Sequence, residues 1–95
     1  MTLIRVQISG HLKDYTGRQN NLEMTDVATV FQLVEKLNEK FPGIKERILD
    51  DQERTRPFVN IFLNGDSIRE LDGEKTTLKD GDTVRILPSV AGGFA

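Results

Sequence analysis

The stretch that decides the fold is Leu78-Lys79-Asp80-Gly81-Asp82-Thr83-Val84-Arg85-Ile86-Leu87-Pro88. Its Asp-Gly-Asp segment predicts a tight turn with Gly81 at positive φ, an angle that glycine adopts without steric cost. The apolar alternation that follows predicts a half-buried strand over residues 83–87. Pro88 ends this strand because proline has no backbone N–H for a sheet ladder. A turn and a strand are thus complete before the segment Ser89-Val90-Ala91-Gly92-Gly93-Phe94-Ala95.

Two further strands are expected near the start of the sequence. Apolar residues alternate with polar ones between residues 2 and 9, which is typical of a strand with one buried face. The alternation resumes between residues 22 and 25. Residues 10–18 between them contain several turn formers, so we expect a hairpin with a long loop.

The apolar period becomes helical at residue 30. Thr29 and Gln32 have the spacing of a capping box, in which the hydroxyl accepts a backbone N–H bond and the amide reaches back. Pro42-Gly43 predicts the end of this helix, and a short helical turn is expected over residues 44–49. One stripe of a helix over residues 30–41 carries its apolar side chains, which are Val30, Leu33, Val34, Leu37 and Phe41.

The strongest strand pattern is Phe58-Val59-Asn60-Ile61-Phe62-Leu63, and the Asn64-Gly65 pair after it is the best short hairpin signal. We expect a brief return strand at residues 67–69. Residues 50–57 hold three acids and two arginines, so they are expected to form a flexible, solvated loop.

This order of elements predicts an α+β fold, a β-grasp (ubiquitin-like) domain with a mixed sheet packed on one main helix. We expect the first and last strands side by side at its centre. We assign residues 1–88 to this domain and residues 89–95 to a flexible C-terminal tail with Gly-Gly and an extension. The side chains expected to face the helix are Ile4, Val6, Ile8, Val59, Ile61, Leu63, Val84 and Ile86.

Composition narrows the classes of function. The 95 residues suit one domain, and a formal net charge of −2 gives no reason to expect nucleic acid or an anionic membrane as a partner. The chain has no cysteine, which excludes disulfides, thiol catalysis and cysteine-ligated metals. The first residues do not resemble a signal peptide, and no apolar run approaches the roughly 20 residues that span a bilayer. We therefore expect a cytoplasmic protein.

Three blocks of the sequence carry a resemblance to a known family: the turn and strand at residues 78–84, Leu87-Pro88-Ser89-Val90-Ala91-Gly92-Gly93, and Arg56-Pro57 continuing through Gly65. With them, the chain resembles the ThiS/MoaD family of ubiquitin-like sulfur carriers. The block that begins at Arg56 is most similar to the branch that carries sulfur for cysteine biosynthesis. The order of elements extends the resemblance over essentially the whole domain.

The resemblance implies a carrier that is a partner of enzymes and not an enzyme itself. In this family a separate E1-like enzyme uses ATP to adenylate the terminal glycine carboxylate, and sulfur then replaces AMP to give a thiocarboxylate. Gly93 would supply that carbonyl carbon, with Gly92, Ala91 and Val90 in the arm that carries it. No cofactor would be bound, because the ATP belongs to the partner. A stretch from Pro88 to Gly93 spans about 20 Å when extended.

The segment departs from ready-to-use family members, which end at the second glycine. Here Phe94 follows Gly93, so the Gly93 carbonyl is an internal amide and cannot be adenylated. Some family members carry a short extension that a JAMM-type zinc metalloprotease removes. We expect cleavage between Gly93 and Phe94. The alternatives are a harmless extension in a chain that has lost carrier function, or residues left by cloning.

Three apolar side chains are candidates for partner docking. Phe62, Leu87 and Phe58 fall opposite the buried positions of their strands, so we expect them on the open face of the sheet, near Leu3 and Arg85. In the resembled family this face meets the activating enzyme and the sulfur-accepting enzyme, and a cysteine synthase is the candidate acceptor here. Cover by the 44–57 region or by self-association is the alternative, and a monomer is expected for the free chain.

Other readings of function stay open. The chain could be a ubiquitin-like modifier that joins Gly93 to lysines, or a binding subunit with an inert tail. The sulfur could also serve methionine, thiamine, molybdopterin or siderophore pathways.

No catalytic constellation or metal site is expected. His11 has no second histidine or cysteine beside it to bind a metal. Asp50, Asp51 and Glu53 read as loop charges, since nothing rigid orients them. Ordinary surface or loop roles are expected for the remaining polar candidates, which are Tyr15, Arg18, Lys13, Lys36, Lys40, Lys45, Lys75 and Lys79.

Overall fold

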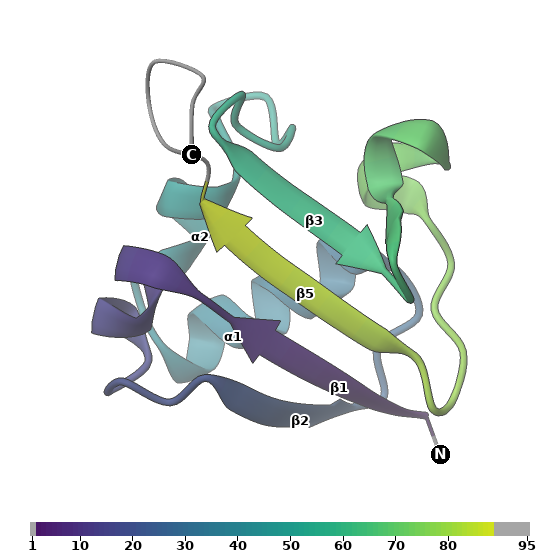
Figure 1. Cartoon of the computed structure of the whole chain (residues 1–95), viewed down its shortest axis with the longest axis horizontal. Coiled ribbons are helices and arrows are strands. Elements are labelled where there is room, and N and C mark those ends of the chain that lie inside the picture. Colours follow the sequence, from purple (N-terminus) through teal and green to yellow (C-terminus); the bar gives the residue numbers. More distant parts are fainter. Residues whose placement is uncertain (1, 89–95) are drawn as a thin grey trace.

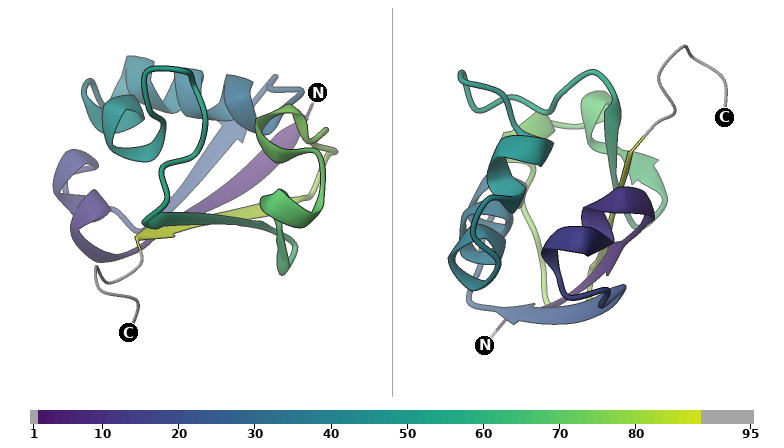
Figure 2. Two further views of the ribbon diagram at one scale, coloured as in Figure 1. Left: turned by 90° about the horizontal axis from the view of Figure 1, so that it is seen from above. Right: turned by 90° about the vertical axis from the view of Figure 1, so that its left-hand side faces the viewer.

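The computed structural model describes residues 2–88, which form a five-stranded mixed sheet in the order β2-β1-β5-β3-β4 (Figure 1). Both α-helices lie on one face of this sheet (Figure 2). None of the helices within residues 2–88 is long and apolar enough to cross a membrane. The elements in chain order are β1 (Leu3–Ile8), η1 (Gly10–Tyr15), β2 (Asn21–Thr25), α1 (Val30–Lys40), α2 (Ile44–Ile48), β3 (Val59–Leu63), β4 (Asp66–Ser67), η2 (Ile68–Glu70), η3 (Gly73–Lys75) and β5 (Thr83–Pro88).

The first and last strands lie side by side, as the sequence predicts. β1 and β5 pair in parallel, with Val6 opposite Val84 and Ile8 opposite Ile86. β2 pairs antiparallel with β1, and β3 pairs antiparallel with β5. The expected hairpin of the first two strands is therefore confirmed.

Helix α1 begins at the predicted cap. The backbone N–H of Gln32 donates to Thr29 Oγ1 at 3.2 Å, and Gln32 Oε1 accepts from the backbone N–H of Ala28 at 2.8 Å. The glutamine thus reaches one residue further back than a regular capping box requires. At the other end, Asn38 Oδ1 accepts from the backbone N–H groups of Gly43 and Lys45, which fixes the turn from α1 into α2.

The core lies between the sheet and the helices. All predicted inward positions of the strands are buried except Leu63, which is partly buried against the cluster. On α1 the first four residues of the predicted stripe are buried, and Phe41 packs at its margin. Burying each aliphatic side chain contributes about 1.5–3 kcal/mol, so this stripe is what holds α1 to the sheet.

Two turns meet at one end of the sheet. Gly81 has φ +91°, as predicted, and its N–H donates to the Leu3 carbonyl. Asn64 and Gly65 both have positive φ, which is typical of a type I′ hairpin turn. The Asn64 side chain donates to Asp82 Oδ1 at 2.9 Å and accepts from the backbone N–H of Thr83 at 2.9 Å, so the two turns are bonded together.

Two segments differ from the sequence prediction. Residues 10–15, predicted as loop, form the 3₁₀-helix η1, because Leu12 is apolar and packs into the core while Thr16 closes the end with bonds to its own neighbours. The return strand expected at residues 67–69 is shorter and earlier, at Asp66–Ser67, because Ser67 caps a turn of 3₁₀-helix at Ile68.

Candidate functional site

The end of β5 is where the described chain stops, between the end of β1 and the start of β3 (Figure 1). Pro88 is the last described residue and pairs with Val59. Its ring packs against Gly10, where a Cβ would stand 2.7 Å from Pro88 Cγ. Since Gly10 also has φ +67°, glycine is required there twice over. The sequence pattern predicts Gly10 only as a turn former and does not indicate this contact.

The residues predicted to carry and release sulfur lie outside the described residues. They are Val90, Ala91, Gly92, Gly93 and Phe94. The described domain fixes only their starting point. Ser9 donates its backbone N–H to the Ile86 carbonyl, and β5 is held on both sides, so this starting point is firmly held.

Phe62 and Leu87 lie on the face of the sheet that the helices leave open. Phe62 is opposite Arg85 and Leu87 is opposite Asn60, so the two apolar side chains are diagonal neighbours on adjacent strands. Both are half-buried, and Arg85 is exposed beside them. The predicted grouping of Phe62, Leu87 and Arg85 is therefore present, but the prediction that Leu3 lies near them is wrong, because the parallel register places Leu3 beside Gly81 at the other end of β1.

Phe58 differs from its prediction. It precedes β3 instead of lying in it, and it is 56% exposed, the highest value for a large apolar side chain among residues 2–88. Phe58 lines a groove together with Gly10, Leu12 and Pro88, at the end of the sheet. The strand alternation placed it on the open face, but the turn at Pro57 and Phe58 ends that alternation.

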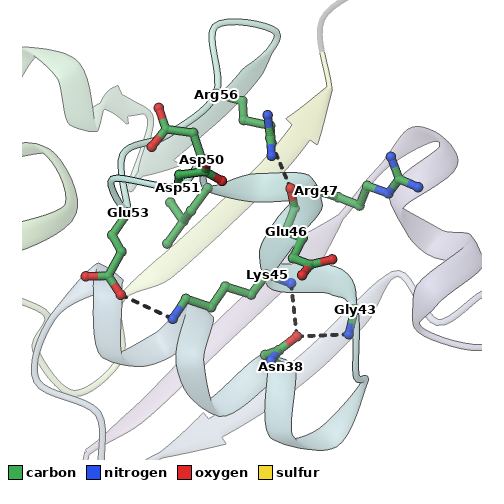
Figure 3. A pocket seen from close by; sticks show the side chains of 10 residues that line it. Asn38, Gly43, Lys45, Glu46, Arg47, Asp50, Asp51, Glu53 and Arg56 are labelled. Carbon is green, nitrogen blue, oxygen red and sulfur yellow. Dashed lines mark hydrogen bonds and ion pairs between the residues drawn. The ribbon is translucent and has the colours of Figure 1, made fainter.

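A second, polar pocket lies between α2 and residues 50–56 (Figure 3). Its charged groups are mostly paired with their surroundings. Lys45 Nζ lies 3.5 Å from Glu53 and 3.6 Å from Glu35, and Arg56 Nε donates to the Glu46 carbonyl at 2.7 Å. No group of three His, Cys, Asp or Glu residues suited to a metal occurs within residues 2–88. These bonds tie residues 53 and 56 to α2, so the groups that line the pocket serve to hold the loop in place.

The 50–57 loop is more ordered by side chains than the sequence suggested. Asp50 Oδ1 accepts from the backbone N–H groups of Gln52 and Arg54, and the Arg54 bond is the largest cause of a lowered Asp50 pKa. Glu74 Oε2 accepts from both the N–H and the hydroxyl of Thr55, at 2.7 and 2.6 Å. Burial acts to raise the pKa of Glu74, but the Thr55 bonds, together with the Glu74 backbone N–H and the charge of Arg54, leave that pKa lowered. No sequence signal pointed to the Glu74–Thr55 contact.

Several polar residues predicted as ordinary have specific partners. Tyr15 OH accepts from Arg47 Nε, joining η1 to α2, and Lys36 Nζ donates to the Thr25 carbonyl. His11 is exposed, as predicted. Arg18 forms only an exposed ion pair with Asp14, which contributes little to stability.

A comparison with protein families gives one decisive match. The model of the ThiS family matches residues 6–93, which include both glycines and all of the sheet except the first three residues of β1. This chain belongs to the ThiS family. The match ends at Gly93, before Phe94.

Individual relatives agree with this family. Sulfur carrier protein CysO of Mycobacterium tuberculosis is 35% identical over 92 residues, which cover 95% of this chain and 98% of that protein. Small archaeal modifier protein 3 of Haloferax volcanii is 41% identical over 68 residues, which cover 72% and 73% of the two chains. Among solved structures, the Amycolatopsis orientalis BexX/CysO complex contains a chain with a TM-score of 0.84 and 34% identity, covering 95% of this chain and 99% of that one.

These similarities confirm the β-grasp fold. The family match confirms the resemblance to the ThiS/MoaD sulfur carriers, and the relatives include proteins named as a sulfur carrier and as a small archaeal modifier.

Proposed function

We propose that this ThiS family member carries sulfur as a thiocarboxylate on Gly93, after removal of the residues that follow it. The observation that carries the proposal is the extent of the family match, which runs through both glycines and stops at residue 93. The relatives named as sulfur carriers are similar over nearly their whole length, which supports the same role here.

The chemistry needs three steps. Water first hydrolyses the Gly93–Phe94 amide, which leaves a free carboxylate on Gly93 and frees the amine of Phe94. The carboxylate then attacks ATP, forming an acyl adenylate and releasing pyrophosphate. A hydrosulfide ion finally attacks the same carbonyl carbon and displaces AMP, which leaves the thiocarboxylate. The carrier supplies only the carbonyl carbon, so the catalysts belong to partner proteins and the carrier itself is not an enzyme.

The position of β5 suits this task. The strand is held between β1 and β3, and Pro88 packs on Gly10, so the chain leaves the domain at a fixed point. From Pro88 to Gly93 the backbone can span about 20 Å, enough to enter a deep partner site. Two glycines at the reacting end suit a narrow channel because they carry no Cβ.

The patch of Phe62 and Leu87, with Arg85 beside it, suits the docking of these partners. Ordering a tail costs free energy on binding, so most of the affinity must come from a surface on the folded domain. We propose an E1-like adenylating enzyme and a sulfur-accepting enzyme as alternating users of this patch. A JAMM-type protease would remove the extension. Cysteine biosynthesis is the proposed destination of the sulfur because the block that begins at Arg56 resembles that branch of the family.

A protein-modifier role is the second candidate. The similarity to a small archaeal modifier protein favours it, because the same activated Gly93 could form an amide with a lysine of another protein. The two roles share the trimming and adenylation steps and differ only in the final nucleophile.

An adenylation assay tests the shared step. Chains ending at Gly93 and at Ala95 are each offered to the adenylating enzyme purified from the same host, and ATP–pyrophosphate exchange is followed. Exchange that depends on the chain ending at Gly93, and is absent with the longer chain, supports the proposal. Equal exchange with both chains, or none with either, contradicts it.

A further inference from the structure

An apolar groove opens beside the point where the described chain stops. Its walls come from η1, from Glu46 and Arg47 of α2, from residues 56–59 and from Pro88 at the end of β5. The volume is about 870 Å³, within the range of pockets that bind ligands of several residues or of drug size. Its apolar lining includes Pro57 and Phe58, and Phe58 is more than half exposed, whereas the lining residues Leu12 and Val59 are themselves buried in the core.

The groove and the following segment are joined by a covalent bond. Pro88 is part of the wall, and Ser89 is the next residue. Residues 89–94 span about 20 Å when extended, and Gly92-Gly93 permits the chain to reverse direction within that length. The segment also carries apolar side chains that match the groove, with Val90 near its start and Phe94 after the two glycines.

We propose that the groove binds residues 89–94 of the untrimmed chain itself, with the ring of Phe94 packed against Phe58. A short tether gives its free end an effective concentration in the millimolar range at the groove. A weak contact therefore suffices for occupancy, whereas a partner protein at micromolar concentration would have to compete with the tethered segment.

The effect of this docking on sulfur carriage depends on the proposed function. Phe94 is the anchor and lies immediately after the bond to be hydrolysed, so a docked extension holds Gly92 and Gly93 against the domain. Hydrolysis of the Gly93–Phe94 amide removes the anchor and releases the arm in the same step. Adenylation of the untrimmed protein would then be prevented in two ways. The Gly93 carbonyl is an amide, and the arm is bound to the groove and cannot enter the partner's site.

Nuclear magnetic resonance of the ¹⁵N-labelled full chain tests the contact without ATP, sulfur or protease. Phe94 lies far in sequence from residues 10–12 and 56–59, so any change that Phe94→Ser causes in the amide shifts of those residues must act through space. We expect those amides to shift on this substitution, to the same positions as in a chain ending at Gly93. Phe58→Ser should in turn shift the amides of residues 89–95.

Leu71→Ser is the matched control, since Leu71 is also an exposed large apolar residue, at 44%, but lies outside the groove. It should leave the amides of residues 89–95 unchanged. Groove amides that are identical in the full chain and in Phe94→Ser overturn the inference. So do differences that vanish on dilution, because a second copy would then be the occupant. Neither result affects the adenylation assay, so docking and carrier function can fail separately.

Discussion

The ring of Pro88 occupies the space that a side chain at Gly10 would need, with only 2.7 Å between the Cβ position and Pro88 Cγ. This contact joins the start of η1 to the end of β5, where the chain leaves the domain. We expect Gly10→Ala to destabilise the fold by about 1–3 kcal/mol through overpacking, beyond the cost of positive φ. Denaturant unfolding measures the change.

Gly17→Ala separates the two costs. Gly17 has φ +64°, close to that of Gly10, and nothing within 4 Å of its Cβ position. Gly17→Ala should therefore lower the free energy of unfolding only by the strain of the left-handed backbone, about 1 kcal/mol. Equal losses at the two glycines would show that the Pro88 contact has no influence on stability.

The bond between the Asn64 turn and the Asp82 turn is a second test. Asn64→Gly keeps the positive φ but loses both side-chain hydrogen bonds, and we expect a loss of about 1 kcal/mol. Asn64→Ala adds left-handed strain and should cost about 1 kcal/mol more. Thermal unfolding distinguishes them, and a glycine variant as stable as the parent chain would refute the role of the bonds.

The Glu74–Thr55 contact predicts a pH dependence. Its lowered pKa means that the carboxylate stabilises the fold fully above the unfolded value of 4.5, and that this contribution is lost as pH falls through the folded pKa. At pH 7 Glu74→Gln should cost about 1 kcal/mol, near the lower end for charged hydrogen bonds because the group is partly solvated. The difference in stability between the variant and the parent chain should disappear at acidic pH.

Melting curves between pH 7 and pH 3 follow this gap. Glu39→Gln, at an exposed position on α1, removes one negative charge without a comparable contact and should show a small, flat difference. A Glu74→Gln difference that stays constant across the range would contradict the assignment.

The open face can be tested in cells of the native host. Phe62→Glu places a charge in the proposed docking patch and should lower the yield of thiocarboxylated chain about tenfold or more, as loss of a central interface residue does. Leu71→Glu introduces the same charge at an exposed site outside the sheet and should leave the yield unchanged. A misfolded Phe62→Glu chain would instead assign Phe62 to the core.

The sequence predicted the elements whose signals are local. Alternation placed Val6 and Val84 on the inner face, and the cap at Thr29 and the turn at Gly81 were found because their spacing alone identifies them. The contact of Gly10 with Pro88 was missed because it joins residues far apart in the chain. Phe58 was placed on the sheet because alternation does not reveal where a strand begins.

The same difference between local and long-range signals applies to the candidate site. Phe62 and Leu87 were placed correctly since strand parity determines the face, whereas the groove beside Pro88 depends on how η1, α2 and residues 56–58 pack together. Glu74 also escaped notice, because a single acid in a turn has no pattern that points to Thr55.

Intact-mass and C-terminal peptide analysis of the protein isolated from its native host tests the central claim most directly. The account predicts a population that ends at Gly93 and carries the mass gain of one oxygen replaced by sulfur, a gain that alkylation of the thiocarboxylate confirms. A population that always retains Phe94, or that ends at Gly93 only as an ordinary carboxylate or as an amide to lysine, would contradict it.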